Sequence, residues 1–175
     1  MRATKHSTLF AAFTGVAALP AAADAADLTV SVEIPRLPVA EYHRPYVALW
    51  IERPDETAVK TLAVWYDTKL PKKEGNTWLK DMRTWWRKAG RSMTLPADGV
   101  SGPTKAPGKQ QVVFTAQQMT GVAPGQYVLA VEAAREVGGR EVVRVPFSWP
   151  AKPGAKPASA AGTTELGAIS VTAKP

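Results

Sequence analysis

Short runs in which apolar and polar residues alternate dominate this sequence after residue 27. In the clearest run, residues 28–34, Leu28, Val30, Val32 and Ile34 alternate with polar side chains. A period of two is typical of a strand with one buried face. Turn-forming residues separate further expected strands, which lie at residues 46–52, 59–66, 109–115, 126–135 and 141–149. The pattern predicts a mostly β fold.

The turns between these runs indicate how the strands are connected. Residues 54–57 have turn composition, so strands 46–52 and 59–66 are expected to form a hairpin. Gly138 and Gly139 favour a second hairpin between strands 126–135 and 141–149. Six or seven short strands with regular turns suggest an immunoglobulin-like β-sandwich. We expect this single domain to span residues 26–150.

One segment changes to a helical period and predicts a single amphipathic helix inserted in the sandwich. Asn76 or Thr77 is suited to cap its start, and Gly90 to end it. The three tryptophans of this segment favour a core-facing stripe, although they are also suited to stack on a flat ring. Apolar residues recur at spacings of three and four at Trp78, Leu79, Met82, Trp85, Trp86 and Ala89.

The remaining segments are rich in proline, glycine and alanine. Residues 91–107 are expected to form a long irregular loop, with a short strand near Met93, and such loops are often functional. Residues 151–164 have the composition of a flexible link. Residues 165–175 follow, and Leu166 to Thr172 is expected to form a C-terminal edge strand.

The N-terminus has the order of a signal peptide. Arg2 and Lys5 precede an uncharged apolar stretch at residues 9–19, and small residues follow. We expect cleavage after Ala25, which removes residues 1–25 and places the mature chain in the periplasm. The absence of cysteine excludes a lipoprotein, disulfides and thiolate-held clusters.

The polar composition also limits the kinds of chemistry available. After residue 25 the chain has 20 basic and 14 acidic residues, a net charge of +6, without the dense basic patch of a nucleic-acid binder. His43 is the one histidine left, which argues against a histidine-based metal centre. His43 with Glu41 and Tyr42 is a weak ligand group, and a hydrolase built on Asp98 or Ser101 lacks a visible base. We therefore expect no self-contained enzyme.

The loop from Asp98 to Thr104 resembles the acceptor motif of bacterial flavin transferases. That motif reads Asp, two variable residues, Ser or Thr, Gly, Ala or Ser, and Thr, whereas Pro103 takes the Ala or Ser position here. The resemblance implies that Thr104 holds FMN through a phosphoester bond, with Asp98, Ser101 and Gly102 as recognition elements. The alternative is an ordinary turn-rich loop, since Asp-Gly and Ser-Gly-Pro are frequent turn formers.

The wider chain is similar to a family of predicted periplasmic proteins known as domain of unknown function 2271. The resemblance covers nearly the whole mature chain. It implies association with flavin transferases and with membrane redox proteins of the PepSY type. It is carried by the runs at residues 46–52, 59–65, 78–87, 101–108 and 124–136.

Two hypotheses for function follow. The first is an immunoglobulin-like periplasmic domain that carries covalent FMN on Thr104 and relays electrons to or from a membrane reductase. The second is a cofactor-free binding or scaffolding module, which recognises another envelope protein through exposed strand edges and a basic helix.

Overall fold

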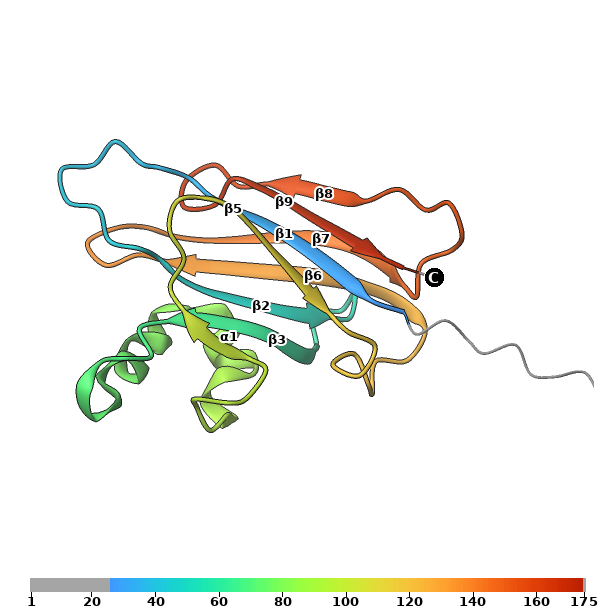
Figure 1. Cartoon of the computed structure of the whole chain (residues 1–175), viewed down its shortest axis with the longest axis horizontal. Coiled ribbons are helices and arrows are strands. Elements are labelled where there is room, and N and C mark those ends of the chain that lie inside the picture. Colours follow the sequence, from blue (N-terminus) through green and yellow to red (C-terminus); the bar gives the residue numbers. More distant parts are fainter. Residues whose placement is uncertain (1–25, 175) are drawn as a thin grey trace, which may run out of the picture.

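The computed structural model describes residues 26–174, and two β-sheets packed face to face form its body (Figure 1). The four-stranded sheet has the order β5-β1-β9-β8, and the five-stranded sheet has the order β4-β3-β2-β6-β7. The predicted mostly β sandwich with inserted helical structure is confirmed. The predicted signal peptide, residues 1–25, lies outside the described residues.

The first sheet contains β1 (Leu28–Ile34), β5 (Gly108–Phe114), β8 (Ala158–Ala161) and β9 (Ala168–Ala173). The second contains β2 (Tyr46–Glu52), β3 (Ala58–Tyr66), β4 (Ser101–Pro103), β6 (Gly125–Ala134) and β7 (Arg140–Trp149). Three helical segments lie between β3 and β4, namely η1 (Pro71–Asp81), α1 (Arg83–Lys88) and η2 (Gly90–Ser92). The two predicted hairpins, β2–β3 and β6–β7, both form as antiparallel pairs.

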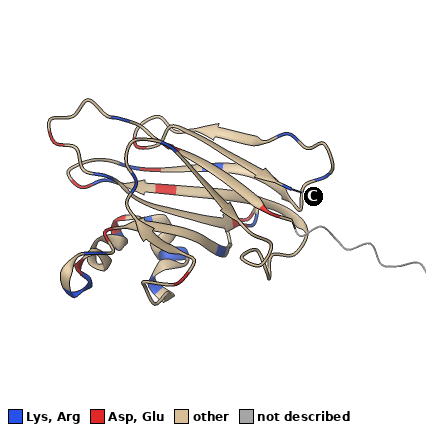
Figure 2. Cartoon of the chain, in the orientation of Figure 1, with Lys and Arg blue, Asp and Glu red and all other residues tan. Residues whose placement is uncertain are grey.

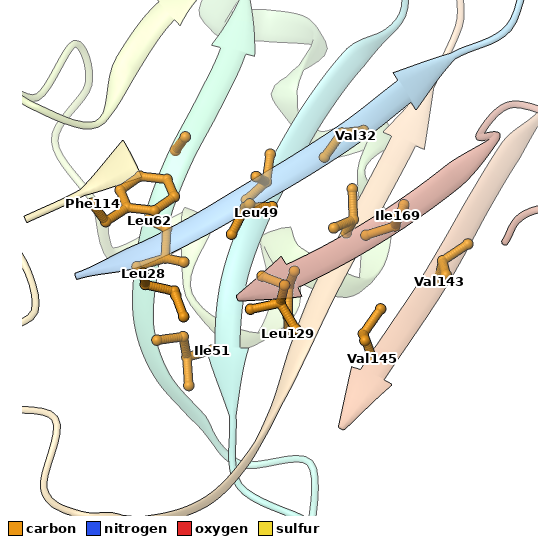
Figure 3. Packing of buried hydrophobic residues seen from close by; sticks show 14 of the residues in the cluster. Leu28, Val32, Leu49, Ile51, Leu62, Phe114, Leu129, Val143, Val145 and Ile169 are labelled. Atoms are coloured by element: carbon orange, nitrogen blue, oxygen red, sulfur yellow. The ribbon is translucent and has the colours of Figure 1, made fainter. Parts of the chain in front are cut away.

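The main core lies between the two sheets, as Figure 3 shows. Alternate residues of β1 point into it, so the predicted period of two matches the burial pattern of that strand. Side chains from both sheets meet there, and the labelled ones include Leu28, Val32, Leu49, Ile51, Leu62, Phe114, Leu129, Val143, Val145 and Ile169.

A second apolar cluster covers the opposite face of the five-stranded sheet. Trp50 and Ala48 of β2 pack there against Leu79, Met82 and Trp85 of the helical segments. Because β2 is covered on both faces, residues 47–52 are all buried. This explains why the strand reads as a continuous apolar run rather than as an alternation.

Two buried glutamates hold the helical segments on this face. Glu132 of β6 accepts hydrogen bonds from the backbone N–H of Thr84 at 3.1 Å and of Trp85 at 2.7 Å. At the other end of α1, Glu52 accepts a hydrogen bond of 2.6 Å from Lys88 Nζ. Both carboxylates have no solvent-exposed surface. Each needs these partners, since an unpaired buried charge is strongly destabilising.

The prediction of one continuous helix over residues 78–89 is wrong in detail. The segment divides into 3-10 turns and a six-residue α-helix, and Met82 has non-helical torsion angles between them. Met82 is fully buried, and Glu132 accepts hydrogen bonds from the N–H groups of Thr84 and Trp85 in the first turn of α1. Burial of the Met82 side chain and the hydrogen bonds to the buried Glu132 carboxylate override the local helical pattern.

Two predictions for the irregular segments are also corrected. The expected strand near Met93 is absent, and β4 forms instead at Ser101–Pro103, where it pairs in parallel with β3. The C-terminal strand forms as β9, but it lies between β1 and β8 and is not an edge strand. β8 itself lies within the segment expected to be a flexible link, and its Ala-Ser-Ala-Ala sequence has no apolar alternation that could predict it.

Candidate functional site

The segment that contains the motif-like residues begins with a tight turn. The N–H of Ser101 donates to the carbonyl of Ala97 at 2.9 Å, and the Ser101 hydroxyl accepts from the N–H of Ala97 at 3.0 Å. Gly99 has a φ of +70°, a conformation that favours glycine. Asp98 is exposed at the tip of this turn. Ser101 therefore stabilises the turn, while Asp98 faces solvent.

The residues after the turn are held at the edge of the five-stranded sheet. Ser101, Gly102 and Pro103 pair with Val64, Trp65 and Tyr66 of β3, respectively. Pro103 lies on an edge strand, which is a position where a missing N–H is tolerated. The predicted loop is thus an ordered edge strand at its centre, and Thr104 follows directly after it.

Lys105 fixes the course of the chain just beyond Thr104. Its Nζ lies 5.5 Å from the centroid of the Trp65 ring, in the range of a cation–π interaction. Trp65 is 4% exposed and belongs to the main core. Thr104 is therefore held between a paired strand and an anchored lysine.

Thr104 lines a pocket with a volume of about 840 Å³. Pockets that bind small molecules commonly have volumes of roughly 300–1,000 Å³. The other walls come from the segment before β2, from η1 and from the β6–β7 turn. The segment before β2 and that turn lie at the same end of the sandwich in Figure 1. The wall residues with long side chains are Tyr42, His43, Arg44, Tyr46, Trp78, Arg83, Arg135, Glu136 and Arg140.

The structure separates the three tryptophans of the predicted helix. Trp85 is fully buried, and its indole N–H donates to the hydroxyl of Thr61 at 3.1 Å. Trp86 is partly buried against the same cluster. Trp78 is 50% exposed and lines the pocket with Thr104. The core-facing interpretation is right for Trp85, whereas Trp78 lies where it can contact a ligand.

The arginines on the pocket walls differ in how they are paired. Arg135 donates from Nε to Glu165 at 2.8 Å, and its side chain is 6% exposed. Arg140 donates to the buried Glu132 at 2.7 Å. Within residues 26–174, Arg44 and Arg83 form no ion pair with a carboxylate. Two guanidinium groups on the walls therefore remain available to an anionic ligand.

Two tyrosines on the pocket walls are held in their neutral form. Burial raises the pKa of Tyr42, and the charge of nearby Arg135 opposes this effect only in part. Burial also raises the pKa of Tyr46. Both phenols therefore keep their protons at neutral pH and can donate hydrogen bonds.

His43 occupies the rim of the same pocket. Its Nε2 lies 2.9 Å from Glu41 and its Nδ1 lies 3.4 Å from Glu136. No group of ligands suited to a metal ion occurs among the described residues. The expected grouping of His43 with Glu41 is therefore present as a hydrogen-bonded pair, with Glu136 as a further partner.

The positive charge of the chain is concentrated beside the pocket. Residues 67–93, which include all helical segments, contain eight basic and three acidic residues, a net charge of +5. The rest of residues 26–174 contains 12 basic and 11 acidic residues, a net charge of +1. Figure 2 shows basic residues on the helical segments that cover β3. The helical segments therefore carry a net positive charge, whereas the charged residues by which residues 67–93 line the pocket are Asp67, Asp81 and Arg83.

Sequence reasoning singled out Thr104, Trp78, Tyr42 and His43 but missed most of the arginines of the pocket walls. Arg135, Glu136 and Arg140 flank the Gly138-Gly139 turn, which was recognised only as a hairpin. Arg44 lies in a proline-rich connection without a pattern. The pairing of Arg135 with Glu165 joins residues far apart in the chain, so no local signal could reveal it.

Comparison with known proteins agrees with the wider resemblance. No curated protein and no solved structure matches the chain. No helix within residues 26–174 is both long and apolar enough to cross a membrane. The sequence matches the family described as "Predicted periplasmic protein (DUF2271)" over residues 27–168, which is most of the chain. The chain belongs to this family of predicted periplasmic proteins.

Proposed function

We propose that this periplasmic protein carries one FMN bound covalently to Thr104 and relays electrons to or from a membrane redox protein. The observation that carries the proposal is the position of Thr104 on the wall of the 840 Å³ pocket, which is also lined by side chains suited to a flavin. Trp78 offers an aromatic surface, and Arg44 and Arg83 offer positive charge. In this role the protein is a carrier and not an enzyme.

Attachment requires a flavin transferase and FAD. The hydroxyl oxygen of Thr104 attacks the phosphorus of the FMN half of FAD, and a new phosphorus–oxygen bond forms. The pyrophosphate bond breaks, AMP leaves, and the hydroxyl proton passes to a base of the transferase. The flavin then supplies the redox chemistry, while the protein supplies position and electrostatics.

The edge position of β4 supports access by the transferase. This strand has three residues and pairs only with β3. Short edge segments are among the parts of a protein that open locally at low cost. Asp98, Gly99 and Pro103 are exposed and available for recognition, while Thr104 is partly buried. We expect the transferase to bind this edge and to draw Thr104 out of the pocket wall.

The charge of the helical segments supports the electron-relay part of the proposal. A net charge of +5 on residues 67–93 attracts negatively charged partners and speeds their encounter. Trp78 and Arg83 belong to these segments and line the pocket. An acidic face on the redox partner would therefore be guided toward the flavin.

The test is co-expression with a bacterial flavin transferase, export and purification from the periplasm. We expect the intact mass to rise by one FMN less one water, together with the yellow absorption of a flavin. Thr104→Ala should abolish both, and Thr120→Ala, which removes another threonine hydroxyl, should change neither. A wild-type chain that stays colourless while a known acceptor is labelled in the same cells would exclude the carrier role.

A cofactor-free binding module is the second candidate. β5 lies at the edge of its sheet, and Val113 on it is 47% exposed. Such an edge can accept an added strand from another protein. If the chain stays unmodified, capture of an envelope protein that is lost on Val113→Lys or on a proline substitution in β5 would support this role.

A further inference from the structure

The pocket beside Thr104 is larger than an attachment point for a phosphate needs. It has a volume of about 840 Å³ and receives side chains from several separate segments of the chain. A phosphoester on Thr104 would leave the rest of the flavin free to turn into this space. The pocket therefore suits the ring system as well as the phosphate.

Trp78 gives the pocket a flat aromatic wall. Its neighbour Leu79 is buried in the cluster beneath the helical segments, so anchoring of η1 does not depend on the indole of Trp78. With 50% of its surface exposed, Trp78 is the one aromatic residue among the large exposed apolar side chains of the described chain. Offset stacking with a flat heteroaromatic ring would cover this surface.

Arg135 and Tyr42, which line the same pocket, each have one buried polar atom without a hydrogen-bond partner. Arg135 binds Glu165 through Nε at 2.8 Å and Nη2 at 3.1 Å, while its Nη1 is buried and has no partner. The hydroxyl of Tyr42 is also buried without a partner. Buried polar atoms are nearly always hydrogen-bonded in folded proteins, and one left unpaired costs about 1–3 kcal/mol.

The ring system of a flavin complements these groups. One end of isoalloxazine carries two carbonyl oxygens and an N–H, and the remainder is flat and apolar. A guanidinium N–H and a phenol O–H are suited to the carbonyl oxygens, and an indole is suited to the flat part. The phosphate end would stay at Thr104, which lines the same pocket.

We propose that the pocket is the seat of the isoalloxazine ring, stacked on Trp78, with its polar end toward Arg135 and Tyr42. This inference rests on the proposed function, since it places the ring of the FMN bound to Thr104. The described residues already form this pocket, and the covalent bond to Thr104 keeps the ring near it at a high local concentration.

Flavin fluorescence tests the seat directly, because stacking of the isoalloxazine ring on an indole quenches the flavin emission. In protein shown by mass to carry one FMN, we expect emission severalfold below that of free FMN at equal absorbance. Trp78→Leu should restore it severalfold. Trp86→Leu, a matched change on α1 that lies off the pocket, should not. Tyr42→Phe should shift the flavin absorption maximum without changing the mass.

The outcomes separate the seat from the covalent attachment. The seat is overturned if the protein carries one full FMN mass but its emission equals that of free FMN and does not change in Trp78→Leu. The proposed carrier role would then still hold. If the wild type gains no FMN, the carrier role fails, and the same variants are titrated with free riboflavin. Saturable quenching that Trp78→Leu abolishes then supports the seat, and the absence of quenching by wild type overturns it.

Discussion

The buried carboxylate of Glu132 accepts a 2.7 Å hydrogen bond from the backbone N–H of Trp85. It also binds the N–H of Thr84 and the guanidinium of Arg140, so one side chain of β6 joins the sheet, the helical segments and a pocket wall. We expect Glu132→Ala to lower the free energy of unfolding by about 2–4 kcal/mol, because three donors lose their acceptor. Urea unfolding of the wild type and the variant measures this loss of unfolding free energy. Glu74→Ala, at an exposed site on η1, should change it by less than about 0.5 kcal/mol.

Trp78 and Trp85 should respond differently to the same substitution. Trp85 is fully buried, so Trp85→Ala should cost about 3–5 kcal/mol of unfolding free energy. Trp78 is half exposed, so Trp78→Ala should cost less than about 1 kcal/mol. Chemical denaturation of the two variants measures the difference. Equal losses would mean that Trp78 is a core residue and would remove the reason to assign it to a ligand.

Glu141 should make the protein sensitive to acid. Burial tends to raise its pKa, but backbone N–H groups of residues 163–166 bind the carboxylate and lower the pKa to about 2, from a usual 4.5. Between these values the unfolded chain binds more protons than the folded one, so stability falls as the pH drops from about 5 to 2.

The effect of Glu141 can be measured by urea unfolding at several pH values. Glu141→Gln should lower the free energy of unfolding at pH 7 by about 2 kcal/mol, less than the full shift implies because the carboxylate stays partly in contact with water. The variant should also lose less stability on acidification than the wild type. Parallel pH curves for the two proteins would show that the contacts of residues 163–166 do not depend on this charge.

The sequence predicted the strands that bury one face or have strong turn signals. β1 and the two hairpins were predicted from alternation and from turn residues. β4 and β8 were missed because three or four small residues carry no periodic signal, and only pairing with β3 and β9 makes them strands. The break at Met82 was missed because its cause, the buried Glu132, lies in a distant strand.

The candidate site was predictable only in part for a related reason. Thr104 stood out through a short motif, and Trp78 through a helical spacing that suggested a core position. The pocket arises where the β6–β7 turn meets the segment before β2 and the helical segments. Residues such as Arg135 and Tyr42 acquire their significance from burial and from missing partners, which a sequence does not show.

The charge on residues 67–93 should steer redox reagents by their sign. In protein reduced after FMN loading, we expect oxidation by anionic ferricyanide to slow as salt increases, and oxidation by cationic hexaammineruthenium(III) to accelerate. The double change Lys72→Glu and Lys73→Glu should slow the ferricyanide reaction about two- to fivefold at low salt.

The matched control for this charge change is Lys152→Glu with Lys156→Glu. These lysines are exposed and line a separate, smaller pocket. Stopped-flow traces should show little change for this variant. If both double variants slow the ferricyanide reaction equally, net charge and not the helical surface controls the encounter.

The central claim is that Thr104 itself carries the flavin, and peptide mapping by mass spectrometry tests it most directly. Trypsin cleaves after Arg91 and Lys105, which releases a peptide of residues 92–105 that contains both Ser101 and Thr104. From protein co-expressed with the transferase, we predict that this peptide gains one FMN less one water, and that fragment ions place the gain on Thr104. An unmodified peptide, or a gain on Ser101 or on any other peptide, would contradict the account.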